Sequence, residues 1–169
     1  NNVGVGIDTL LVNTTGTGNT AVGNYTLDAN TDADFNTAVG YNALSGVTTG
    51  TGNTAVGAYC LDASTTAISN VAVGYYALSA ITTGASNTSI GTGSMQSSTT
   101  GTGNVAVGRD TLNADTTGDY NVAVGFNSSV LMTTGDRNVS VGPYSLDACT
   151  TGQYNVGIGS SSLGSLTTA

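Results

Sequence analysis

Apolar and polar positions recur every seventeen residues along the whole chain. In each unit, position one is Asn, position four is Val or Ile, position five is Gly and position thirteen is Thr. Position nine is Leu or Met in every unit except the one that carries Ser129. No insertion shifts the register, and the units begin at Asn2, Asn19, Asn36, Asn53, Asn70, Asn87, Asn104, Asn121, Asn138 and Asn155. A fixed short period with constant apolar and glycine positions is typical of stacked solenoid repeats.

Each unit predicts two short strands and two bends. Positions two to four alternate β-branched and small residues, which indicates a strand, and we expect Val39 at position four to face the interior. Gly40 then forms a corner that requires a positive φ or a close approach. Leu44 at position nine returns to the interior on a second strand and meets the valine across a narrow core. The Thr-Thr-Gly segment that starts at Thr48 forms the second bend.

Stacking these units predicts an all-β parallel β-solenoid, or β-roll, of ten 17-residue rungs in a single domain, residues 1–169. At the spacing of paired strands, ten rungs form a rod roughly 48 Å long. The Asn36 column can pass amide hydrogen bonds between rungs, and the Thr48 column can do so with hydroxyls. Neither end carries a polar cap, so we expect the rod to continue beyond this segment or to stack end to end.

Charge and composition remove several classes of function. Lys and Arg number 2 against 10 acidic residues, all Asp, and the net charge is −8. This balance argues against nucleic-acid binding and against docking on an anionic membrane. No apolar run reaches the roughly 18 residues of a membrane span, so we expect no membrane insertion. The chain has no His and no Glu, which removes most catalytic and metal-binding arrangements, so we predict no enzyme activity and no cofactor.

The remaining chemistry consists of cysteines and aspartates. Cys60 and Cys149 lie five rungs apart, roughly 24 Å, which predicts free, buried thiols. Asp119 and Asp136 share position sixteen on neighbouring rungs, at about the spacing of retaining glycosidases. Solvated turn carboxylates are the preferred interpretation of that pair. Exposed turn aspartates are also the preferred interpretation of two groups of acids, with calcium as the alternative, although their spacing matches neither the EF-hand loop nor the GGxGxD repeat of calcium-binding rolls. These groups are Asp28, Asp32 and Asp34, and Asp110, Asp115 and Asp119.

Aromatic residues mark a candidate ligand surface. Tyr120, Arg137 and Tyr154 occupy position seventeen on consecutive rungs, which predicts a guanidinium between two phenol rings. Tyr59 and Tyr76 stack at position seven with Tyr75 beside them. Such patches suit sugars, and the alternative is that the aromatic rings cover rung edges. Because threonine is abundant, ice binding is a further alternative. However, the threonines at positions thirteen, fourteen and sixteen do not form a regular array of outward side chains.

The string Asn36 to Leu44, NTAVGYNAL, resembles two groups of repeats. One is the head repeat of trimeric autotransporter adhesins, whose small-apolar-Gly motif is similar to Ala38-Val39-Gly40. The other is found in phage tail-fibre and bacterial surface proteins. The resemblance implies a β-roll that is left-handed in the adhesin heads, three chains packed side by side, and attachment at a cell surface or virion. The small residues at position three agree with such packing of chains, because they would let a neighbouring chain approach closely. The adhesin unit is shorter than seventeen residues.

These features together predict an extracellular structural fibre or adhesin segment that associates with itself, as a homotrimer or an end-to-end filament. One alternative is a fibre tip that binds surface glycans or another receptor through its aromatic and Asp columns. A second alternative is an ice-binding solenoid.

Overall fold

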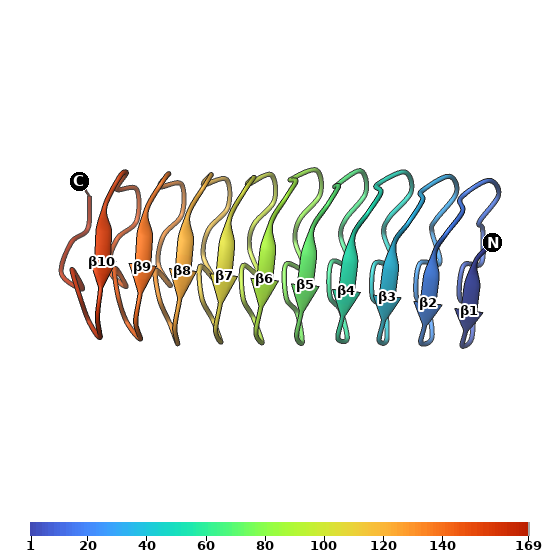
Figure 1. The fold of residues 1–169 in the computed structure, drawn as a ribbon, viewed down its shortest axis with the longest axis horizontal. Helices are drawn as coiled ribbons and strands as arrows, with labels where there is room; N and C mark the ends of the chain where they lie inside the picture. Colours follow the sequence, from blue (N-terminus) through green and yellow to red (C-terminus); the bar gives the residue numbers. More distant parts are fainter. Residues whose placement is uncertain (169) are drawn as a thin grey trace.

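Ten three-residue strands form one parallel sheet in the computed structural model, which describes residues 1–168 (Figure 1). The strands are hydrogen-bonded in chain order from first to last. No helix occurs among the described residues. This confirms the predicted all-β solenoid with one 17-residue unit per rung. The strands are β1 (Val3–Val5), β2 (Thr20–Val22), β3 (Thr37–Val39), β4 (Thr54–Val56), β5 (Val71–Val73), β6 (Thr88–Ile90), β7 (Val105–Val107), β8 (Val122–Val124), β9 (Val139–Val141) and β10 (Val156–Ile158).

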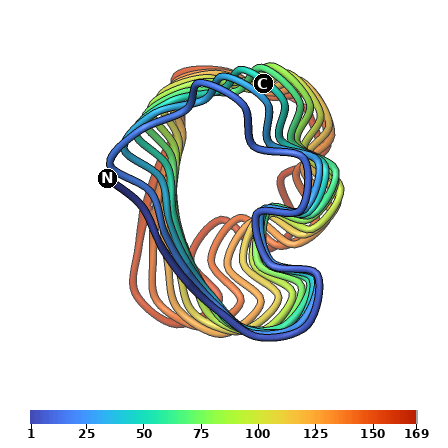
Figure 2. The same cartoon turned by 90° about the vertical axis from the view of Figure 1, so that its right-hand side faces the viewer.

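Equivalent residues of successive units stand directly above one another. Val22 pairs with Val39, and Val39 pairs with Val56, so each unit position forms a column along the rod axis. Viewed end on, the rungs superpose into a ring with the strands on a straight side and an indentation on the opposite side (Figure 2). The rod therefore has a flat sheet face and, opposite to it, a face made of turns.

The orientation of the strand is the reverse of the predicted one. Val39 is 37% exposed, whereas Ala38 at position three is fully buried. The interior is narrow here because position three faces position eight across the rung: in unit six, the Ser89 hydroxyl donates to the Ser94 carbonyl at 2.8 Å. The small column therefore lines the core and does not admit a neighbouring chain, and β-branched residues point outward.

The predicted second strand does not form, because positions six to eleven make a series of turns. Asn42 and Leu44 adopt positive φ angles of 54° and 52°, which no extended strand allows. The turns nevertheless bond from rung to rung, as where the Leu44 amide donates to the Cys60 carbonyl at 3.0 Å. Leu44 accepts its left-handed backbone because its side chain is fully buried.

Position five is a glycine corner, as predicted. Gly40 has a φ of +143°, and a Cβ there would lie 2.5 Å from the carbonyl oxygen of Gly57 on the next rung. Any side chain would push the two rungs apart. The invariant glycine therefore keeps successive rungs at hydrogen-bonding distance.

Leucine at position nine fills the centre of the core, as predicted for Leu44. The exception, Ser129, is compensated by polar partners. Its hydroxyl donates to the Ser140 hydroxyl at 2.8 Å, and Ser128 donates to the same oxygen at 2.8 Å. Three buried serines thus satisfy one another where the leucine column is broken. Within residues 1–168, no helix is both long and apolar enough to cross a membrane.

Candidate functional site

An asparagine ladder runs through the rod at position one. The Asn53 backbone amide donates to Asn36 Oδ1 at 2.9 Å, and Asn53 Nδ2 donates to the same oxygen at 3.1 Å and to the Ala67 carbonyl at 2.8 Å. The pattern recurs along the stack, which confirms the predicted amide column. At position thirteen, the Thr48 hydroxyl donates to the Thr65 carbonyl at 3.3 Å. Both columns hold neighbouring rungs together.

The outer sheet face is a regular surface, although its position-four residues were expected in the core. Positions two and four point outward from each strand. Val56, Val71, Val73 and Ile90 are each 36–39% exposed, although their chain neighbours at position three are buried. No residue at positions two to four is charged. The face is therefore a flat array of valine, isoleucine and threonine that repeats at each strand.

Five tyrosines form a continuous strip across units two to five, at positions six and seven, which follow the glycine corner. Tyr25 contacts Tyr41 edge to face at 5.7 Å between ring centroids, and Tyr41 contacts Tyr59 at 5.4 Å. Tyr59 stacks on Tyr76 at 4.9 Å, as predicted, and Tyr75 lies beside both rings. The sequence pattern grouped Tyr59, Tyr75 and Tyr76 but missed that positions six and seven of adjacent rungs bring Tyr25 and Tyr41 into contact with them.

A cavity of about 430 Å³ lies beside this strip. Tyr41 lines it from position six, Tyr25 from position seven, and Asp28, Ser45 and Asp62 from position ten. Oδ1 of Asp28 is buried without a hydrogen-bond partner. Burial raises the pKa of both Asp28 and Asp62 above the ordinary value. The cavity thus joins aromatic rings to poorly solvated carboxylates.

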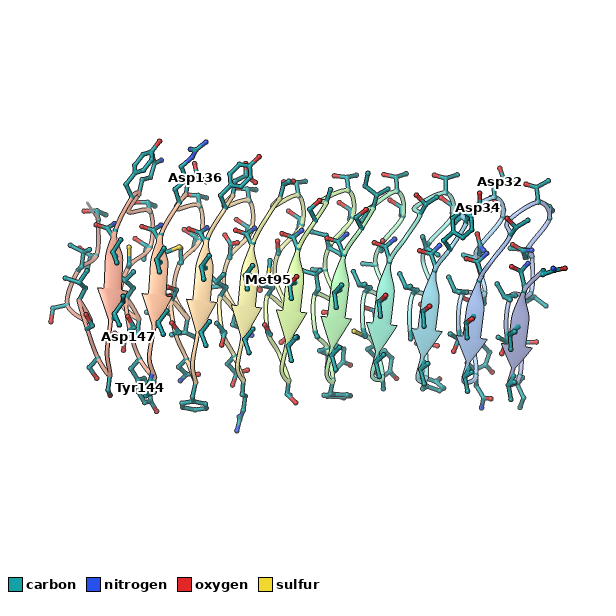
Figure 3. The ribbon with its side chains drawn as sticks, in the orientation of Figure 1. Asp32, Asp34, Met95, Asp136, Tyr144 and Asp147 are labelled. Carbon is teal, nitrogen blue, oxygen red and sulfur yellow. The ribbon has the colours of Figure 1, made fainter. Side chains whose placement is uncertain are left out.

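The Arg137 guanidinium lies between two tyrosine rings, as predicted. It is 5.4 Å from the Tyr120 ring centroid and 5.6 Å from that of Tyr154. Figure 3 shows the neighbouring Asp136 on the upper edge of the rod, the edge that also carries Asp32 and Asp34. Tyr144, which shares position seven with three tyrosines of the strip, lies on the lower edge. The arginine cluster and the tyrosine strip therefore belong to different edges and different ends of the rod.

The aspartates at position sixteen bond the backbone of the preceding rung. Asp136 Oδ1 accepts from the Asp119 amide at 2.8 Å, and Asp119 Oδ1 accepts from the Thr102 amide at 2.8 Å. Asp34 does the same for Thr17 at 2.6 Å. These bonds give the pair at 119 and 136 a structural role in the turn.

The two groups of acids proposed for calcium are spread around their rungs. Asp28 lines the cavity, whereas Asp32 accepts from the Thr15 hydroxyl at 2.8 Å on the opposite bend. In the other group, Asp115 lies inside the rod and Asp110 pairs with Arg109 at 3.0 Å on the surface. Among residues 1–168, no three Cys or Asp side chains are placed to hold one metal ion.

Two kinds of titratable group lie inside the rod. Cys60 and Cys149 are free and buried, as predicted, and burial raises the pKa of Cys60 to about 12. Asp115 at position twelve is fully buried, and one oxygen, Oδ2, has no hydrogen-bond partner. Burial, with the nearby charges of Asp119 and Asp136, raises the pKa of Asp115 to about 7. Sequence analysis placed Asp115 on the surface because position twelve varies too much to indicate a core position.

Comparison of the chain with protein-family models, with curated proteins and with solved structures finds no match.

Proposed function

We propose that this chain is a segment of an extracellular fibre or adhesin at a cell or virion surface: a rigid rod without catalytic activity that packs side by side with copies of itself. The observation that supports this best is the uncharged, β-branched face formed by positions two and four. Parallel sheets are nearly always covered on both faces. Here the turns and the leucine column cover one face, and the other is open in a single chain (Figure 2).

The dimensions of the face fit a protein contact. The strands are three residues wide and ten rungs long, so the face measures on the order of 500 Å². Continuous apolar patches larger than a few hundred Å² mark interaction surfaces. Two such faces in contact would bury on the order of 1,000 Å² in total, which is about the minimum for a specific interface.

A second copy of the chain is the partner whose surface fits this face best. Its rows of valine side chains repeat at the same strand spacing, so the side chains of two faces can interdigitate along the full length of the rod. An unrelated globular protein has no such period. The contact also brings no charges together, because none of the face residues carries one. Three copies could pack in the same way, as the resemblance to adhesin heads implies, with positions two and four at the interface instead of position three.

The test is sedimentation velocity over a range of concentrations. The wild-type chain should form dimers or trimers, and Val56→Glu with Val73→Glu should weaken association at least tenfold, because each buried carboxylate lacks a partner. Thr66→Glu with Thr83→Glu is the matched control, since it adds the same charge to exposed positions on the same two units. Circular dichroism of all three forms verifies the fold.

Two results would contradict the proposal. One is a wild-type chain that remains monomeric at every concentration. The other is freezing-point hysteresis in a monomeric chain that the double valine variant abolishes, because the flat face would then bind ice and not a second copy.

A further inference from the structure

The cavity beside the tyrosine strip has the chemistry of a saccharide site. Its volume, about 430 Å³, falls within the range of small-molecule pockets. Tyr25 and Tyr41 are 37% and 45% exposed as residues, so they remain open to a ligand. The strip continues through Tyr59 to Tyr76 by ring contacts of 4.9–5.4 Å. Apolar contact is therefore available both in the cavity and along the axis beside it.

The polar groups of the cavity call for a ligand that donates hydrogen bonds. Asp28 and Asp62 are carboxylates, which only accept when ionised. The buried Asp28 Oδ1 has no partner of its own, so a donor from a ligand would relieve an existing desolvation cost. Asn42 and Ser45 also line the cavity, and they can donate as well as accept.

A sugar ring supplies both kinds of contact at once. Its C–H surface packs on aromatic rings, and its hydroxyls both donate to carboxylates and accept from amide and hydroxyl groups. A simple cation would use the carboxylates and the tyrosine faces but leave the donors of Asn42 and Ser45 unused. An acidic sugar would meet two carboxylates in a cavity that no Lys or Arg lines. The combination favours an uncharged saccharide.

We propose that the cavity lined by Tyr25, Tyr41, Asp28 and Asp62, with the adjoining tyrosine strip, binds an uncharged oligosaccharide along the rod axis. The site is built within one chain from turn positions six, seven, ten and eleven, whereas the sheet face is formed by positions two and four. It is therefore independent of the side-by-side assembly.

The test is calorimetric titration with maltohexaose, cellohexaose and chitohexaose as neutral probes, a heparin hexasaccharide as the anionic probe, and spermidine as the cationic probe. At least one neutral probe should bind, and the heparin fragment should not. Tyr41→Ala should weaken that binding at least tenfold, and Asp62→Asn at least threefold. The Val56→Glu, Val73→Glu variant should bind the same probe unchanged, which separates failure of this site from failure of the assembly.

Matched controls come from the same chain. Tyr154→Ala removes an exposed tyrosine from the other edge, and Asp32→Asn removes one exposed carboxylate without touching the cavity. Both should leave the affinity unchanged. The proposal is overturned if no neutral probe binds at about 10 mM, if spermidine alone binds, or if Tyr154→Ala weakens binding as much as Tyr41→Ala.

Discussion

Two columns inside the rod, at positions one and twelve, differ in how much variation they allow. Position one is Asn in all ten units. Position twelve is buried through the middle eight units yet holds a different type of residue in almost every one. From the first unit to the last, the residues are Asn13, Asn30, Val47, Ser64, Ile81, Ser98, Asp115, Met132, Cys149 and Leu166.

Hydrogen bonding explains the difference. Each asparagine of the first column serves its own unit and the next one, so a substitution leaves buried backbone groups of two rungs without partners. Position twelve mainly fills volume, and side chains of several sizes can do that when the neighbouring rungs adjust. The asparagine position is therefore constant because it bonds neighbouring repeats. A position that varies in sequence, such as position twelve, can nevertheless be buried in the core.

The largest expected effect is the loss of one ladder asparagine. Asn87→Ala leaves the Gly101 carbonyl and the Asn104 amide buried without partners. At about 1–3 kcal/mol for each orphaned group, plus lost packing, the free energy of unfolding should fall by on the order of 5 kcal/mol. Asn24→Ala is the control, because Asn24 is exposed and accepts one bond from Ile7. Equal losses in thermal or urea unfolding of the two variants would refute the role assigned to the ladder.

Asp115 should make stability depend on pH. Its pKa rises from 3.8 to about 7 on folding, so between these values the unfolded chain releases a proton that the folded chain keeps. The free energy of unfolding therefore falls as pH rises from about 4 to about 7, by up to about 4 kcal/mol, and levels off above. Asp28 and Asp62, whose pKa values are also raised, add a smaller slope of the same sign.

Asp115→Asn should remove most of this slope and stabilise the rod at pH 8. Unit two shows how an amide fits position twelve: Asn30 Oδ1 accepts from the Ala33 amide at 2.9 Å, as Asp115 Oδ1 does from Gly118. Unfolding of both chains at pH 4.5 and pH 8 measures the change. A wild-type rod that is equally stable at the two pH values would show that Asp115 ionises freely.

The smallest effect belongs to the serines of position twelve. Ser64 and Ser98 are fully buried, and their hydroxyls have no hydrogen-bond partner. Ser98→Ala removes such a hydroxyl, so the free energy of unfolding should stay the same or rise by about 1 kcal/mol. Ser145→Ala is the contrast, since that buried hydroxyl donates to the Gly157 carbonyl at 3.0 Å and its loss should destabilise. The account fails here if both variants lose the same stability.

The repeat made the stack, its register, the glycine corner and the two ladders predictable, because each depends on residues that recur. Which side of the strand faces inward was not predictable from the alternation alone. Val39 and Ala38 alternate equally well in either orientation, and the choice depends on the width of the rung, which the turns determine. The cavity was not predictable from the repeat, because it combines Tyr25, Tyr41 and Asp62 from three different units. None of these residues lies at a position whose residue type recurs in every unit.

Distances between spin labels on the outer face test the central claim of in-register stacking most directly. In a Cys60→Ala, Cys149→Ser background, labels would be placed at Val39 and, in turn, at Val107, Val124 or Val141. The account predicts separations of roughly 19, 24 and 29 Å, rising by one strand spacing per unit, with labels that are mobile in solvent. Separations that do not rise in equal steps, or a label at position 39 as immobile as one at position 38, would contradict it.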